Sequence, residues 1–220
     1  LTSDYNTAVG HSALNLNTGA SNTAVGAAAL TSNAAGTRNT AVGANALYTN
    51  TSGNYNAAVG YDALQSNLGG QMNTAIGDRA LTENSSGSYN TALGQAALEQ
   101  NTTAGNNTAL GYGTLTVNTI GADNVAIGKD ALKSNVDGSR NTAVGVSALY
   151  YTDPASAVIM NNTAVGHDAG LRITTGTANT AIGAQAMRCG TADMTGSANV
   201  AIGMYALKAI TSAANNVAVG

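Results

Sequence analysis

The side chains that could carry out acid–base or metal chemistry are few in this chain and lie far apart. The only two histidines, His11 and His167, occupy the same place in a repeated segment but are nine repeats apart. In a stack of parallel strands that separation is about 43 Å, so no single-chain site could hold both. No zinc-protease, esterase, phosphate-loop or EF-hand motif occurs either. We therefore expect no enzymatic activity and no cofactor.

Pairs of aspartates offer calcium as an alternative. Asp62 and Asp78 lie about one repeat apart, as do Asp123 and Asp137, and carboxylates are ligands that calcium prefers. The spacing is that of no known calcium-binding repeat, and Arg79 lies close enough in the sequence to neutralise the charge. We accordingly expect no metal site.

Aromatic residues are the better candidates for contact with a ligand. These candidates are Tyr55, Met72, Tyr89, Tyr61, Tyr112 and Tyr151. The first three share one place in successive repeats, the next two share another, and the last lies in an insertion. Stacked repeats would align such rings in columns suited to a sugar or a protein receptor. Packing between neighbouring turns is the alternative.

The amino-acid composition further narrows the class of protein to which this chain can belong. Cys189 is the only cysteine, which excludes an intrachain disulfide; we interpret it as a small buried filler, with an exposed thiol joining chains as the alternative. A net charge of −3 with eight Lys and Arg argues against nucleic-acid binding. No apolar run approaches the ~18 residues of a membrane span. Scarce cysteine fits an extracellular, cell-surface or virion location.

All these residues are positioned by a repeat of the type Asn-Thr-Ala-Val-Gly. Its opening asparagines are Asn6, Asn22, Asn39, Asn56, Asn73, Asn90, Asn107, Asn124, Asn141, Asn162, Asn179, Asn199 and Asn216. The intervals are 16, then 17 seven times, then 21, 17, 20 and 17. A unit this short cannot fold alone, so each copy must pack against the next. We interpret 1–220 as a single array of about thirteen coils, a segment of a longer fibre, with loop insertions near 150–161 and 188–198.

Counted from the opening asparagine as position 0, each repeat carries a fixed pattern. Position +1 is mostly Thr, +2 is always Ala, +3 is Val, Ile or Leu, and +4 is always Gly. Ala at +7, Leu at +8, Asn at +11 and Gly near +14 follow in most of the early repeats, and Gly170-Leu171 is interpreted as shifting the Leu column by one residue.

This pattern predicts an all-β parallel solenoid with two short strands per coil, over +1 to +3 and around Ala-Leu. Helix is disfavoured because Gly recurs at +4 and +14. The opening asparagines are expected to form a ladder of amide hydrogen bonds between coils, the alternative being that Asn merely suits a turn.

Strand alternation separates +1 and +3 from 0, +2 and +4. We expect the apolar residue at +3 and Leu at +8 to fill the interior, at ~3–6 kcal/mol per coil, which is too little to offset the ordering of 17 residues. The small Ala and Gly at +2 and +4 are therefore expected to pack against other copies of the chain. The alternative is that they line a very narrow interior.

The repeat resembles the head repeats of trimeric autotransporter adhesins (YadA-like) and is similar to the Asn-Thr-Ala-Val-Gly arrays of bacteriophage tail fibres. The resemblance covers Asn6 to Gly220 and implies a left-handed β-roll in a parallel homotrimer. The period here is 17 residues rather than about 14, and no stalk, neck or anchor is present, which favours the phage-fibre type.

The function expected from this is that of a structural or adhesive fibre segment, acting as a rigid shaft or as the part that contacts a host glycan or protein receptor. A bacterial adhesin head or a self-assembled extracellular filament is the second hypothesis. An ice-binding solenoid is the third, because the Thr column at +1 is regular.

Overall fold

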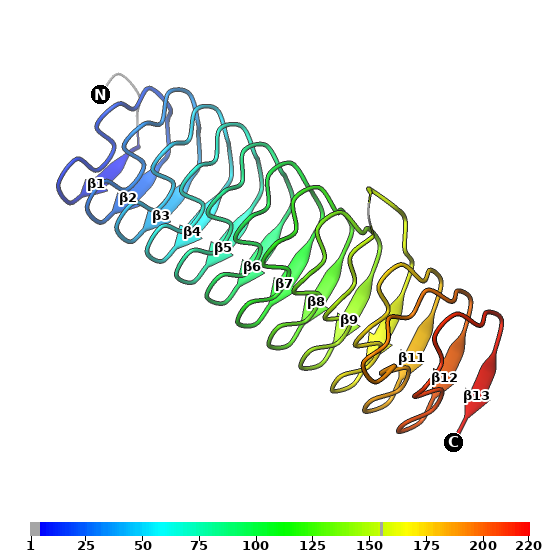
Figure 1. The fold of residues 1–220 in the computed structure, drawn as a ribbon. Coiled ribbons are helices and arrows are strands. Elements are labelled where there is room, and N and C mark those ends of the chain that lie inside the picture. Colours follow the sequence, from blue (N-terminus) through cyan, green and yellow to red (C-terminus); the bar gives the residue numbers. More distant parts are fainter. Residues whose placement is uncertain (1–4, 155) are drawn as a thin grey trace.

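The computed structural model describes residues 5–154 and 156–220, which wind into one elongated stack of coils with the two termini at opposite ends (Figure 1). Residues 1–4 and Ala155, which belong to the predicted array and its first insertion, lie outside the described residues. Thirteen three-residue strands form one sheet in chain order. They are β1 Thr7–Val9, β2 Thr23–Val25, β3 Thr40–Val42, β4 Ala57–Val59, β5 Thr74–Ile76, β6 Thr91–Leu93, β7 Thr108–Leu110, β8 Val125–Ile127, β9 Thr142–Val144, β10 Thr163–Val165, β11 Thr180–Ile182, β12 Val200–Ile202 and β13 Val217–Val219. The predicted all-β parallel solenoid is confirmed.

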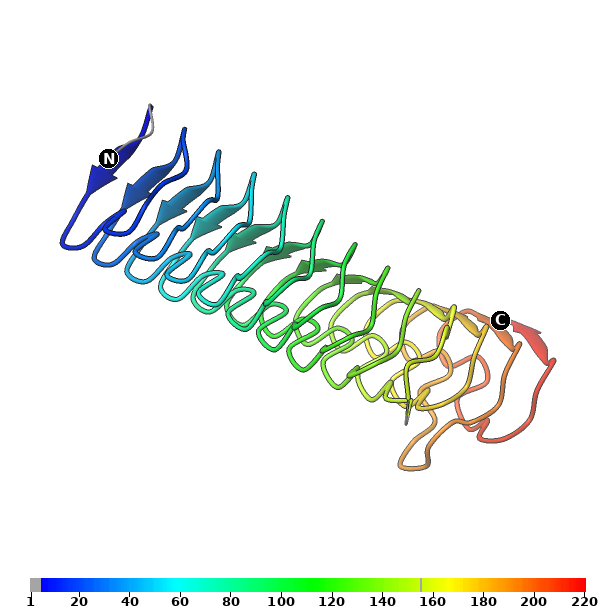
Figure 2. The same cartoon turned by 90° about the horizontal axis from the view of Figure 1, so that it is seen from above.

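The strands pair in parallel with equivalent positions opposite one another. Between β5 and β6, for example, Ala75 pairs with Ala92 and Ile76 with Leu93. The same register persists across both irregular intervals, where β9 pairs with β10 and β11 with β12. Both insertions are therefore absorbed by loops: one rises from the stack between β9 and β10 in Figure 1, and the other, coloured orange, projects from it in Figure 2.

The predicted second strand in each coil is wrong. The Ala-Leu segment is a run of turns in which the residues at +6 and +8 have positive φ, as at Arg79 (54°) and Leu81 (53°). The segments of adjacent coils are still joined by backbone hydrogen bonds, such as the one from Leu81 N–H to the Ala97 carbonyl (3.0 Å). Left-handed residues bend the chain sharply, and a coil of only 17 residues has to turn sharply to close on itself.

The interior is filled from the face opposite to the one predicted. Ala75 at +2, Ala80 at +7 and Leu81 at +8 have no exposed surface, whereas Ile76 at +3 is 39% exposed; most of the other internal coils share this pattern. Ala at +2 thus lines a narrow interior, so the expectation that it packs against other copies is wrong, while Gly at +4 remains partly exposed. A cross-section this small has room for one large apolar side chain per coil, and Leu at +8 takes it.

The coil that starts at Asn162 fills this space differently. Gly170 stands at +8 with φ 60°, and a Cβ on it would lie 2.9 Å from both Ile173 and Leu149 side-chain atoms. Ile173 is fully buried, while Leu171 is only partly so. Ile173, and not the expected Leu171, therefore replaces the missing Leu in the core.

Glycine at +4 is required by the backbone. Gly77 has φ 135°, and a Cβ on it would lie 2.6 Å from the carbonyl oxygen of Gly94 in the next coil. This close approach of successive coils explains why no other residue occurs at +4.

Candidate functional site

The opening asparagines form a hydrogen-bonded ladder through the interior. The side chain of Asn73 is fully buried; its Oδ1 accepts the backbone N–H of Asn90 (2.9 Å), and its Nδ2 donates to the Gly87 carbonyl (2.9 Å) and to Asn56 Oδ1 (3.2 Å). The first two of these bonds recur along most of the stack. Each asparagine thus closes its own coil and positions the backbone of the next, so this ladder is a structural element.

A second amide ladder runs through position +11. Asn84 Nδ2 donates to Asn67 Oδ1 (2.8 Å) and to the Gly87 carbonyl (3.0 Å). The ladder ends at Asn135, whose buried Oδ1 has no hydrogen-bond partner among the described residues. The next coil, which contains the first insertion, has Thr152 at position +11 instead of Asn. Thr152 donates to the Ile173 carbonyl (2.8 Å) and so does not continue the ladder.

The side chains at +1 and +3 of the thirteen strands make up a flat outward surface, hereafter the strand face. Nine of the +3 residues in the internal coils are 36–41% exposed, and the +1 residues beside them are partly or well exposed. Every residue in both columns is Thr, Ala, Val, Ile or Leu, so no charged side chain lies on this face. The sequence predicted these columns but placed the +3 column inside.

The predicted ligand-contact residues fall in three separate places. Tyr55, Met72 and Tyr89 precede the strand in successive coils and are 46%, 45% and 59% exposed. Tyr61 and Tyr112 follow the strand, at +5, in coils that are three repeats apart. Both columns thus flank the strand face.

Neighbouring coils supply partners for some of these rings. The Arg38 guanidinium donates to the Tyr55 hydroxyl and lies 5.2 Å from the ring centroid, and the Lys129 amino group lies 5.8 Å from the centroid of Tyr112. Packing between turns therefore accounts for part of these columns, and their contact with a ligand stays a prediction.

Tyr151 lies elsewhere, at a recess of about 560 Å³. This recess, hereafter the polar recess, is lined by Tyr151, Asp153, Arg172, Thr174, Asp193 and Thr195 among others. Its lining comes from four consecutive coils, beginning with Ser134, and includes residues from both breaks in the repeat. Sequence reasoning singled out the two insertions but missed Arg172 and Asp193, because residues more than 20 positions apart meet only once the coils are stacked.

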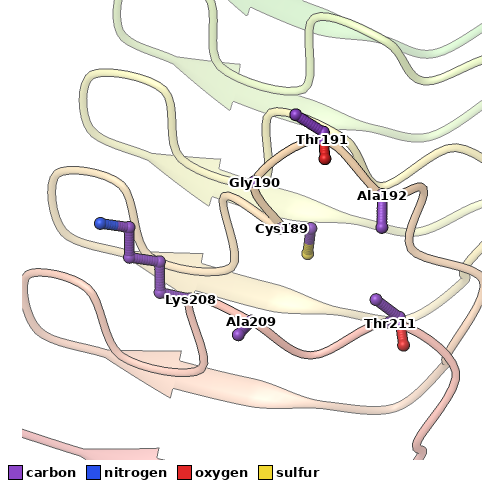
Figure 3. Close-up of a pocket in the computed structure, with 7 residues that line it drawn as sticks. All are labelled: Cys189, Gly190, Thr191, Ala192, Lys208, Ala209 and Thr211. Carbon is purple, nitrogen blue, oxygen red and sulfur yellow. The ribbon is translucent and has the colours of Figure 1, made fainter.

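A second recess, of about 350 Å³, lies beside the second insertion and is lined by Cys189, Ala192, Lys208 and Thr211 among others (Figure 3). Cys189 is 3% exposed, and burial raises the pKa of its thiol to about 11. The Lys208 amino group points away from the sulfur (Figure 3). The thiol is thus a buried filler, and the alternative of an exposed cysteine that joins chains is wrong.

The remaining candidate groups do not converge. His167 lies 3.5 Å from the carboxylate of its neighbour Asp168. Asp78 is paired with Arg79, whereas Asp62 accepts hydrogen bonds from Asn45 and Gln65. Within the described ranges no group of three or more His, Cys, Asp or Glu side chains could hold a metal ion.

Across residues 5–154 and 156–220, no helix has the length and apolar character needed to cross a lipid bilayer.

The fold and these surfaces define a parallel β-solenoid with one flat, uncharged sheet face and a polar recess at its repeat breaks. No protein-family model, curated protein or solved structure matches the chain significantly.

Proposed function

We propose that this chain is the shaft of a homo-oligomeric extracellular fibre, in which parallel copies pack through the strand face. The observation that carries the proposal is the row of outward Val, Ile and Leu side chains at +3, with no charged residue in either column of the face. A soluble chain rarely exposes so regular an apolar surface unless another molecule covers it.

The area of the strand face fits a second copy of the chain. Thirteen strands spaced by ~4.8 Å span about 60 Å, and three residues of strand add about 10 Å of width, which gives roughly 600 Å². That is close to the ~800 Å² per partner of a standard interface, and the flanking Tyr and Met columns widen it. Because the columns run the full length of the rod, parallel copies in register would place equivalent coils side by side.

The resemblance of the repeat to trimeric adhesin heads and phage tail-fibre arrays supports a left-handed homotrimer with a shared long axis. In this proposal the protein acts as a rigid spacer or receptor-contacting shaft on a virion or cell surface and carries out no catalysis. The adhesin head and the extracellular filament subunit are versions of the same assembly and differ in what the fibre is attached to.

The proposal is tested by the mass of the native particle in light scattering. A trimer would have close to three times the 21.6 kDa of the chain. Replacing Ile76 and Leu93, both at +3, by Arg is expected to yield monomers that keep the β-rich circular dichroism spectrum. The matched control is Gln100→Arg, an exposed +10 position away from the strand face, which should leave the mass unchanged. A monomeric wild-type protein would refute the proposal.

Ice binding is a second candidate, favoured by one observation. The Thr column at +1 and the apolar column at +3 lie together on one regular sheet face. Two ordered columns are therefore present, whereas the sequence alone indicated only the Thr column. This hypothesis requires the face to be bare in solution. A monomer that shows thermal hysteresis, lost in Thr74→Lys, would favour ice binding over the fibre.

A further inference from the structure

The geometry points to the polar recess as a binding site for a neutral sugar residue of a glycan. The inference deepens the proposed function, because it names the ligand class that a fibre of this kind would contact. None of the recess-lining residues belongs to a strand or to the strand face, so the site does not depend on how copies of the chain pack.

The recess is held in place by the backbone. Tyr151 N–H donates to the Leu171 carbonyl (3.0 Å), and Asp153 N–H donates to that of Thr174 (3.2 Å). In the following coil, Thr174 N–H donates to the Met194 carbonyl (3.1 Å), and Met194 N–H donates to the Arg172 carbonyl (2.8 Å). These bonds join the segments that carry Tyr151, Arg172 and Asp193, so their polar side chains project from a fixed frame and little ordering is needed on binding.

The polar groups in the recess retain unused hydrogen-bonding capacity. The Arg172 guanidinium lies 4.6 Å from the Tyr151 ring centroid, and its Nε lies 3.6 Å from Asp193 Oδ1, which is beyond hydrogen-bond distance. Its Nε–H is buried without a hydrogen-bond partner in the described part of the chain, so the donors that face a ligand are the terminal NH2 groups of the guanidinium. Asp193 is 60% exposed. A planar guanidinium held against a ring and ion-paired with an exposed carboxylate presents donors and acceptors at fixed positions, which is what vicinal hydroxyl groups require.

The charge of the recess favours a neutral ligand. Asp153 and Asp193 outnumber Arg172, so an anionic sugar would meet net repulsion. Burial and the nearby Asp137 carboxylate raise the pKa of Asp153, which shows that negative charge is already disfavoured here. Arg172 lies within the lining, so a metal cation is equally unsuited. The volume of about 560 Å³ falls within the ~300–1,000 Å³ typical of small-molecule sites.

A peptide fits the recess less well than a sugar. Extended peptides bind by adding a strand to a free sheet edge, and the recess has no strand in its lining. It also lacks an apolar pocket for a side chain, since Tyr151 is its only large apolar lining residue. Sugars, in contrast, combine hydroxyl groups with C–H faces that pack on a Tyr ring.

The test uses saturation-transfer difference NMR with the methyl glycosides of glucose, galactose, mannose and N-acetylglucosamine. Sialyllactose serves as the anionic probe and tetraglycine as the peptide probe. We expect at least one neutral glycoside to bind with a Kd of about 1 mM. Asp193→Asn should weaken that binding about tenfold, and Arg172→Lys should do the same because lysine lacks the planar fork.

Asp193 is exposed, and among the described residues its side chain makes only the ion pair with Arg172, so its variant should stay folded; Asp78→Asn, far from the recess, should bind like the wild type. The inference is overturned if no neutral glycoside binds at ~10 mM, if binding survives both recess substitutions, or if sialyllactose or tetraglycine binds best. The mass and the sugar binding of the wild type together separate the two proposals: a monomer that binds the sugar refutes only the fibre, and an oligomer that does not bind it refutes only the recess. The Ile76→Arg, Leu93→Arg double variant should bind the sugar like the wild type.

Discussion

Replacing Asn73 tests the inner ladder that holds successive coils together. In Asn73→Ala the chain loses three side-chain hydrogen bonds, to Asn90 N–H, the Gly87 carbonyl and Asn56 Oδ1. At ~1 kcal/mol each these are worth about 3 kcal/mol, and leaving the buried Asn90 N–H without an acceptor costs a further 1–3 kcal/mol. The variant should therefore lose about 4–6 kcal/mol of unfolding free energy.

Asn73→Asp has the same shape and adds a dependence on pH. Its carboxylate still accepts from Asn90 N–H, but its second oxygen now faces the Gly87 carbonyl with no proton between them. Burial without a donor raises the folded-state pKa of this carboxyl above its unfolded value. The protonated form, which can donate to Gly87, is therefore favoured in the folded chain. The deficit relative to the wild type should be largest above the folded-state pKa and should shrink as the pH falls through it.

Urea denaturation followed by circular dichroism, at several pH values and a fixed protein concentration, measures both effects. Amide exchange at Asn90 reads the local loss directly, which matters because long repeat arrays can unfold in parts. Gln71→Ala is the matched control: Gln71 is exposed two residues earlier, and its loss should change stability by less than ~0.5 kcal/mol. The ladder would be refuted if Asn73→Asp were as stable as the wild type at neutral pH, or if its deficit did not depend on pH.

Three further substitutions, one of them with a matched control, test the backbone and the recess. Gly77→Ala should destabilise the fold by at least ~3 kcal/mol, because its Cβ would meet the Gly94 carbonyl at 2.6 Å; a thermal midpoint like that of the wild type would contradict the close coil contact. Ala178→Gly should stabilise the chain by about 0.5–1 kcal/mol, since Ala178 is exposed and has a positive φ of 55°. The control is Ala184→Gly, which should destabilise the chain by a similar amount because Ala184 is exposed but has no positive φ. Equal effects of the two substitutions in urea titrations would disprove the strain argument. Asp153→Asn should raise stability above the folded-state pKa of Asp153, which is raised by burial and by Asp137. The gain should fade as the pH falls from the folded-state pKa to the lower unfolded pKa; a gain that persists in acid would show another cause.

The local geometry of the return segment could not be predicted from its residue types. Leu64 and Leu81 are poor candidates for positive φ, yet both adopt it, at 52° and 53°. Local preference favours extended or helical backbone at such residues. Burial of the Leu side chain and the hydrogen bonds to the next coil outweigh that preference, and neither can be read from one repeat in isolation.

The polar recess was predicted only in outline. A lengthened interval between asparagines marks a loop, so the sequence located both breaks. Tyr151, Arg172 and Asp193 share no motif, however, and they meet because three stacked coils bring two +10 positions and one +14 position onto one side of the rod. Without the stack there was no reason to group a Tyr with an Arg and an Asp about 20 and 40 residues further along the chain.

The sequence by itself determined the stacking. Asn, Ala and Gly recur at constant places in a 17-residue period, and only parallel coils in register pair every copy with the next. Only the tertiary structure decided which side of the strand faces inward. Alternation of side chains defines two faces of the strand but does not say which face is buried. The volume enclosed by the closed coil decides that. With Leu81 and two amide ladders inside, that volume admits Ala75 and excludes Ile76. The apolar column at +3, which the sequence predicted to be in the core, therefore lies on the surface of the rod.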